Sequence, residues 1–171
     1  MAIKFHNPAS VSFSGKYSLG AEVPEGARML YVSGQVGVDS RGKLQPTFEK
    51  QAAQVWKNIA QVLKSGGMSY KNIVKVTVFL TDSRFIGPYR TVRDQFIKDA
   101  PYPASTLLVV AGLADPAMLV EVEVVAGEGR ERIDLMLTFV FADDAKVPAG
   151  ALNAASFDLP ADVQVLQRPR V

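Results

Sequence analysis

The sequence has no cysteine and a single histidine among its 171 residues. Without cysteine, the chain can form no disulfide, no thiolate metal site and no cysteine nucleophile. A serine–histidine–aspartate triad would have to use His6, which lies in the N-terminal segment. A metal ion would depend on carboxylates such as Glu121 and Glu123. Two carboxylates are a thin ligand set, so we expect no metal site.

An excess of one charge and long apolar runs are also missing. The chain has 19 basic and 17 acidic residues, for a net charge of +2. No basic cluster is longer than a couple of residues, so nucleic acid is not expected as the main partner. No run approaches the ~18 apolar residues of a membrane span, and no basic region followed by an apolar one opens the chain. We therefore expect a soluble, cytoplasmic protein with no membrane partner.

What the sequence does contain is apolar residues in regular patterns. Hydrophobic residues make up 48% of the chain, which excludes a disordered protein and allows a substantial core. Between residues 48 and 64 they recur every three or four positions, which predicts an amphipathic helix with Trp56 as a core anchor. A second helix is expected to be capped by Asp82, to be limited at its start by Pro88 and to end near Lys98.

Short apolar runs before, between and after these helices predict strands. The order of strands and helices indicates an α+β fold, with two helices on one face of a sheet and the other face open. The run 104–112 is almost continuously apolar and is expected to be covered on both faces. The expected strands are 11–15, 17–19, 28–34, 73–80, 104–112 and 119–126.

Residues 130–171 differ in character from the rest of the chain. One more strand is expected over 133–141, after which prolines interrupt any regular pattern. We therefore expect a domain over 1–129 and a C-terminal extension of unknown role over 130–171. The extension either packs on the body or a neighbouring subunit, or is disordered after Asp143.

The most informative feature is the pair Glu121 and Glu123. On a strand both carboxylates point to one face, while the valines at 120, 122 and 124 point to the other. The valine face can be buried against helices, but a buried unpaired carboxylate is very costly. The pair therefore marks a functional site, or an edge strand that its glutamates keep soluble. Apolar and acidic residues mix on this face, so we also expect oligomerisation through it.

Five motifs follow one another along the chain: Ser33-Gly34-Gln35-Val36-Gly37-Val38-Asp39, Val55-Trp56-Lys57-Asn58-Ile59, Ile73-Val74-Lys75-Val76-Thr77-Val78-Phe79-Leu80, Pro103-Ala104-Ser105-Thr106 and Val120-Glu121-Val122-Glu123. In this order they resemble the RidA/YjgF family, over roughly residues 8–128. The resemblance implies an α+β fold like that of bacterial chorismate mutase, a mixed sheet with two helices on one face. It also implies a homotrimer with small-molecule clefts between subunits.

The resemblance assigns roles to three matching residues. Glu121 corresponds to the glutamate associated with a bound water near the imine carbon, and is the expected catalytic residue. Tyr17 corresponds to a tyrosine of the cleft, and Ser33 to the serine that lines it; both are expected to bind substrate. Glu123 is left as an interface or structural residue.

Two positions depart from the family pattern. Ser105 stands where members active on imino acids carry an arginine that holds the substrate carboxylate, and one hydroxyl cannot replace a planar guanidinium fork. Arg90 stands in the second helix where members often have asparagine. Arg90 is expected either to supply a relocated cation at the cleft or to be a solvated helix residue.

These departures leave the activity open between three readings. The resemblance implies hydrolysis of reactive enamines and imines, such as 2-aminoacrylate, to keto compounds and ammonia, without a metal or an organic cofactor. The alternative is a trimer that binds a small molecule without catalysis, or a hydrolase for a substrate without a carboxylate. Endoribonuclease activity, an older description of some members, is the least expected, because the charge is nearly balanced.

Overall fold

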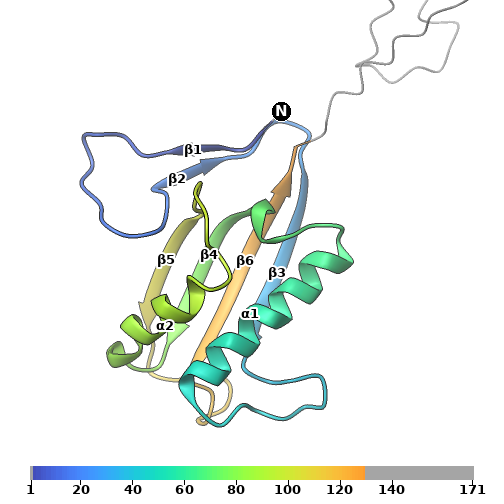
Figure 1. Ribbon diagram of the computed structural model, residues 1–171, viewed down its shortest axis with the longest axis vertical. Helices are drawn as coiled ribbons and strands as arrows, with labels where there is room; N and C mark the ends of the chain where they lie inside the picture. Colours follow the sequence, from blue (N-terminus) through green and yellow to red (C-terminus); the bar gives the residue numbers. More distant parts are fainter. Residues whose placement is uncertain (1, 130–171) are drawn as a thin grey trace, which may run out of the picture. The chain divides into compact units, whose positions relative to one another are not determined.

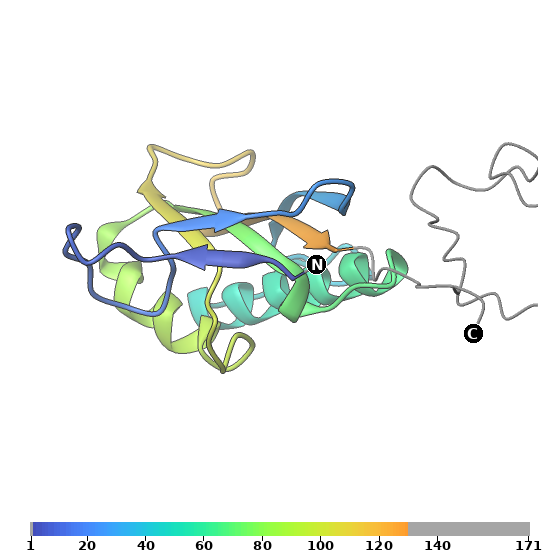
Figure 2. The same ribbon diagram turned by 90° about the horizontal axis from the view of Figure 1, so that it is seen from above.

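The computed structural model describes residues 2–129. Its centre is a four-stranded sheet in the order β3-β6-β4-β5, with α1 (Phe48–Ser65) and α2 (Ile86–Arg93) on one face (Figures 1 and 2). β6 runs antiparallel to β3 and β4, whereas β4 and β5 are parallel, so the sheet is mixed as expected. The sheet strands are β3 (Arg28–Val36), β4 (Ile73–Leu80), β5 (Ala104–Val109) and β6 (Val120–Glu128).

Local sequence signals explain α1. The Thr47 side chain accepts a hydrogen bond from the Lys50 amide at 3.3 Å, which caps the first turn. Gly66 closes the last turn, and Gly67 follows with a φ of +70°, a left-handed conformation that suits glycine. The helix predicted over 48–64 is therefore confirmed within one residue.

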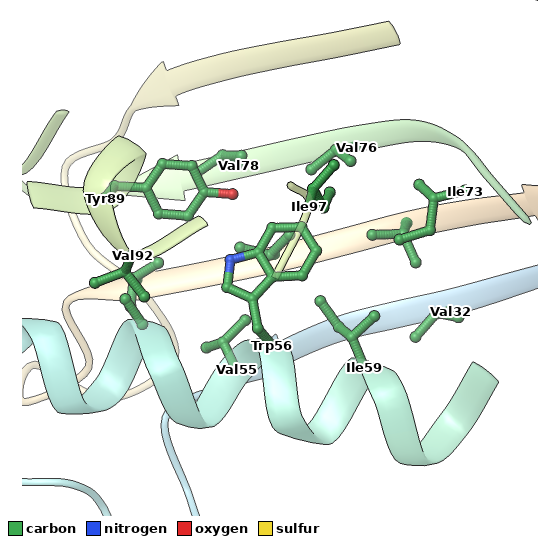
Figure 3. Packing of buried hydrophobic residues seen from close by; sticks show 14 of the residues in the cluster. Val32, Val55, Trp56, Ile59, Ile73, Val76, Val78, Tyr89, Val92 and Ile97 are labelled. Carbon is green, nitrogen blue, oxygen red and sulfur yellow. The ribbon is translucent and has the colours of Figure 1, made fainter. Parts of the chain in front are cut away.

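The core lies between the helices and the sheet. Trp56 of α1 is fully buried, and the side chains around it come from α2 and from the inner face of the sheet (Figure 3). β6 supplies Val120, Val122 and Val124, exposed by 0%, 0% and 2%. The valine face of this strand is thus buried against the helices, as the alternation predicts.

The predicted strands at 11–15 and 17–19 are wrong. A separate two-stranded ribbon forms instead from β1 (Lys4–His6) and β2 (Gly20–Glu22). Alternation of Val11 and Phe13 with serines imitates a strand, but both apolar side chains are exposed. No neighbouring strand pairs with this stretch, so its pattern has nothing to be buried against.

The second helix is shorter than predicted. Asp82 caps the 3₁₀ turn η2 (Ser83–Phe85), and α2 then ends at Arg93 rather than near Lys98. Val92 and Ile97 are both buried although they lie five residues apart, a spacing that one helical face does not provide. The chain continues past Arg93 in turns that bury both residues.

The expectation for strand 104–112 is also wrong for the single chain. β5 ends at Val109 and is an edge strand, and Leu108 and Val109 are 41% and 49% exposed. An apolar run alone does not show whether both faces of the strand are covered within one chain.

The extension 130–171, with its predicted strand at 133–141, lies outside the described residues, so these remain predictions. Between residues 2 and 129, no helix is both long enough and apolar enough to span a membrane.

Candidate functional site

The side chain of Glu121 lies directly over Gly34 of the neighbouring strand. The pairing of β3 with β6 shifts between Val32 and Gln35, which marks a bulge at Ser33 and Gly34. A Cβ atom placed on Gly34 would lie 1.7 Å from Oε1 of Glu121 and 2.7 Å from its Cδ. Only a residue without a side chain allows this carboxylate to occupy its position. The glycine of the Ser33-Gly34-Gln35 motif therefore makes room for Glu121.

A second close approach fixes the end of the same motif. At Gly37, a Cβ atom would lie 2.6 Å from the Cα of Gln51, so the chain here packs directly on α1. Asn58 of α1 donates hydrogen bonds to the carbonyls of Val36 and Val38, at 3.1 and 2.9 Å. These contacts hold the strand that carries Ser33 against a rigid helix.

Glu121 and Ser33 both belong to the face of the sheet that the helices do not cover. A hollow of about 200 Å³ on this face is lined by Ser33, Glu123, Thr77 and Lys75, with Tyr31 at its side. The Lys75 ammonium donates a hydrogen bond to Thr106 of β5. The face is thus polar and charged at its centre, while Tyr31 is 76% exposed.

Three of the predicted substrate-binding residues meet at a different cavity. Tyr17, Arg90 and Ser105 line a cavity of about 230 Å³ between α2 and β5. Its remaining lining residues are Tyr89, Arg93 and Leu107.

The Tyr17 loop is held beside β5 by backbone contacts. The Ser18 amide donates to the Pro103 carbonyl at 3.0 Å, and Ser18 forms a parallel bridge with Ala104. The Asn7 side chain accepts from the amide of Leu19 at 2.8 Å. Tyr17 therefore reaches the cavity through a loop docked on β5, and not through the strand that the sequence predicted.

A carboxylate next to this cavity is shared by two cations. Asp94 Oδ1 accepts from Nε and Nη2 of Arg93 at 3.0 and 2.7 Å, and Asp94 Oδ2 lies 3.0 Å from the ammonium of Lys16. Burial alone would raise the pKa of Asp94, but the hydrogen bonds from Arg93 and Lys16 outweigh it and hold that pKa below its usual value. In the part of the chain that the structure describes, the Arg90 side chain has no such partner.

The two groups of predicted residues lie on opposite faces of the sheet. Paired residues on adjacent strands share a face, and Glu121 pairs with Phe79, whose partner on β5 is Leu108. Ser105 pairs with Val76, a buried residue of the face that the helices cover. One chain therefore does not bring Glu121 and Ser33 together with Tyr17, Arg90 and Ser105.

Several residues of these sites were not assigned a role from the sequence. Gly34 lies inside a predicted strand, and a glycine at such a position is a known signal of a bulge or of a close approach by another group. Arg93 and Asp94 are adjacent opposite charges, a pattern too common to stand out. Tyr89 is buried on the inner side of α2, and its hydroxyl has no hydrogen-bond partner within residues 2–129. Burial raises its pKa.

No three histidine, cysteine, aspartate or glutamate side chains within the described residues 2–129 form a group able to hold a metal ion.

Comparison with known proteins places these features in a family. A family model described as endoribonuclease L-PSP matches residues 9–128, a stretch that holds Glu121, Gly34 and the Tyr17 loop. The chain belongs to this family. The resemblance to RidA/YjgF proteins that the motifs carry is thereby confirmed.

Individual relatives agree with this placement. A mouse (Mus musculus) protein named 2-iminobutanoate/2-iminopropanoate deaminase is 35% identical over 124 residues, which cover 71% of this chain and 86% of the relative. A solved structure of RidA from the Antarctic bacterium Psychrobacter sp. PAMC 21119 is 32% identical with a TM-score of 0.55, covering 67% of this chain and 90% of that one.

A further solved structure supports the fold alone. A protein of the Rid family from Yersinia pestis, called YyfB and of unknown function, gives a TM-score of 0.68 at 24% identity, over 74% of this chain and 98% of that one. The α+β fold with two helices on a mixed sheet is thus shared with solved members of the family.

Proposed function

We propose that this protein hydrolyses reactive imines or enamines of small metabolites, in clefts that are completed when it assembles as a homotrimer. The observation that carries the proposal is the Glu121 carboxylate, held over Gly34 on the open face of the sheet. The mouse relative's name, 2-iminobutanoate/2-iminopropanoate deaminase, supports the reaction class.

The chemistry needs few groups because an imine carbon is already electrophilic. Water adds to that carbon while the C=N electron pair moves to nitrogen; Glu121 would take a proton from the water as a general base and pass it to the nitrogen as an acid, which gives a carbinolamine. Glu121 would then take the hydroxyl proton of the carbinolamine and pass it to the nitrogen, so that the C–N bond breaks, a carbonyl forms and ammonia leaves. Ser33 and Tyr17 would position the substrate by hydrogen bonds.

The arrangement of the site supports a role for a second copy. Tyr17 and Ser105 lie behind the sheet as seen from Glu121, so one chain offers no single pocket for all three. A neighbouring copy that packs its β5 edge near the open face would bring the two groups to one cleft. Exposed Tyr31 and Leu108 provide apolar area for that contact.

One observation favours a rival function. Ser105 lines the cavity with a single hydroxyl, and a hydroxyl cannot hold a carboxylate as a guanidinium fork does. The rival is a trimer that binds a small molecule without turnover, or that hydrolyses a substrate without a carboxylate. If the natural protein is inactive on imino acids and Ser105→Arg gains activity, the rival is supported.

The test is imine hydrolysis with substrates generated in place by an amino-acid oxidase. We expect turnover by the natural protein and a loss of about 10²- to 10⁴-fold for Glu121→Gln, which keeps the shape but removes the base. Glu123→Gln is the matched comparison, because it changes the same charge two residues along the strand. A rate for Glu121→Gln equal to that of the natural protein, with both variants assembled alike by size-exclusion chromatography, would overturn the assignment.

A further inference from the structure

The cavity between α2 and β5 carries more positive charge than its neighbours neutralise. Arg90 and Arg93 both line the cavity, and Lys16 lies next to it, where it forms an ion pair with Asp94. Asp94 also pairs with Arg93. This region therefore holds three positively charged side chains and one carboxylate.

The two arginines differ in what already occupies them. The Arg93 side chain is 13% exposed, and two of its nitrogens are used by Asp94. Arg90 is exposed on the outer turn of α2 and has no ion pair or side-chain hydrogen bond within residues 2–129. Its five donors are available to a ligand in the cavity.

The other groups that line the cavity also suit a small anionic ligand. Tyr17 and Ser105 contribute hydroxyls that can donate to an anion, and Leu107 contributes an apolar wall. No acidic residue lines the cavity itself, since Asp94 turns its oxygens to Arg93 and Lys16. A cavity of about 230 Å³ has room for a small organic molecule.

The ion pairs also fix the geometry of the cavity. Lys16 precedes Tyr17, so its contact with Asp94 ties the Tyr17 loop to α2. Phe13 packs edge-on against the Tyr17 ring at 5.5 Å between centroids. The loop is thereby held on the same helix that carries Arg90.

We propose that Arg90 binds the carboxylate of a small organic acid in this cavity, opposite the Tyr17 and Ser105 hydroxyls. The inference rests on the proposed function in that the acid is taken to be the substrate or product of the same cleft. It assigns the recognition of the ligand's charge to Arg90 of α2, because Ser105 offers only a hydroxyl at the same cavity.

The test compares an acid with its neutral analogue. 2-Oxobutanoate and 2-oxobutanamide differ in the carboxylate alone, and their affinities can be measured by isothermal titration calorimetry on the full chain. We expect the natural protein to prefer the acid and Arg90→Gln to weaken acid binding by about 10- to 100-fold while leaving the amide unchanged. Arg90→Lys should keep part of the preference, because it retains the charge but not the fork.

Arg84→Gln provides the matched control. Arg84 is an exposed arginine that pairs with Asp82, and it does not line the cavity. This variant should bind both ligands like the natural protein. An acid-to-amide ratio that Arg90→Gln leaves unchanged, or an absence of acid binding by the natural protein, would overturn the proposal. The proposal would also be overturned if inorganic phosphate displaced bound 2-oxobutanoate at a lower concentration than acetate does, because the site would then prefer phosphate to a carboxylate.

The outcome separates this inference from the proposed function. If Arg90→Gln keeps the acid preference while Glu121→Gln still abolishes imine turnover, the carboxylate assignment fails and the hydrolase proposal stands. If acid binding depends on Arg90 but no imine is hydrolysed, the binding site is supported and the hydrolase proposal fails.

Discussion

The two faces of β6 differ in what they require of the sequence. On the face toward the helices, Val120, Val122 and Val124 are almost fully buried. On the other face, Glu121 is half-buried over Gly34 and Glu123 is exposed. The same strand thus contributes apolar area to the core on one side and charge to the open face on the other. Residues of the first face should govern stability, and residues of the second should govern assembly and chemistry.

The largest effect on stability is expected at the centre of the helix-covered face. Trp56→Ala removes a fully buried side chain and leaves a cavity among α1, α2 and the sheet. We expect the free energy of unfolding to fall by about 3–5 kcal/mol. Urea unfolding followed by circular dichroism measures the loss.

Trp56→Phe serves as its control. Phenylalanine keeps most of the apolar volume and removes an indole nitrogen that has no hydrogen-bond partner within residues 2–129. The cost should therefore be well below that of alanine. Equal costs for both variants would contradict a core held mainly by packing at this position.

On the open face, Gly34→Ala should lower activity rather than stability. The added methyl group would meet the end of the Glu121 side chain, which can rotate away at little cost. The backbone is not strained, since Gly34 is not among the glycines with positive φ. We expect imine turnover to fall by at least about tenfold, because a displaced base no longer reaches its water. The measurement pairs a turnover assay with urea unfolding.

Gly112→Ala is the corresponding control. A Cβ atom on Gly112 meets nothing within 4 Å, and this glycine also lacks a positive φ. Turnover and stability should both stay close to those of the natural protein. A Gly34→Ala protein with full activity would show that the Glu121 carboxylate is not needed where the structure places it.

Patterns along the chain predicted the helix-covered face well. The apolar rhythm of 48–64 and the Val-Glu alternation of β6 each have a local cause, the repeat of a helix or strand facing one core. The sequence therefore predicted α1, β4 and the inner face of the sheet almost to the residue. The mistaken strand at 11–15 had the same kind of pattern but no partner to pair with, and the stretch 17–19 forms only the isolated bridge from Ser18 to Ala104.

The open face and the cavity could be predicted only in part. The family resemblance named Glu121, Ser33, Tyr17, Arg90 and Ser105 as site residues. It did not show that the sheet separates the first two from the other three within one chain. That separation depends on register between strands distant in sequence. The contact of Glu121 with Gly34 likewise depends on a bulge in β3, which no periodicity reveals.

Assembly gives a further way to test the contrast between the faces. Leu108 is 41% exposed and shares the open face with Glu121, so Leu108→Glu would place a charge in the proposed interface. We expect the dissociation constant of the proposed trimer to rise at least about tenfold. Analytical ultracentrifugation over a range of concentrations measures it.

Val11→Glu is the control for assembly. Val11 is 49% exposed but lies in the loop between β1 and β2, outside the strands of the four-stranded sheet. Its substitution should leave the oligomeric state unchanged. If the natural protein stays monomeric at all concentrations, the proposed contact between copies is wrong.

The smallest effect concerns the ion pairs behind β5, and it depends on pH. The pKa of Asp94 is held below its usual value by Arg93 and Lys16, so the folded state favours the charged carboxylate. The stabilisation that the charged Asp94 contributes is present above the unfolded-state pKa of about 3.9 and is lost as the pH falls through the lower folded-state value.

Because the Asp94 side chain is 30% exposed, we expect its contribution to the free energy of unfolding to stay below about 1 kcal/mol. Urea unfolding of Asp94→Asn should therefore show a deficit near pH 7 that shrinks as the pH falls below about 3.9. A deficit that does not shrink over this range would mean that Asp94 acts through packing and not through its charge. Lys16→Gln, alone and combined with Asp94→Asn, completes a double-mutant cycle. The cycle gives the interaction free energy between Lys16 and Asp94, the ion pair that ties the Tyr17 loop to α2.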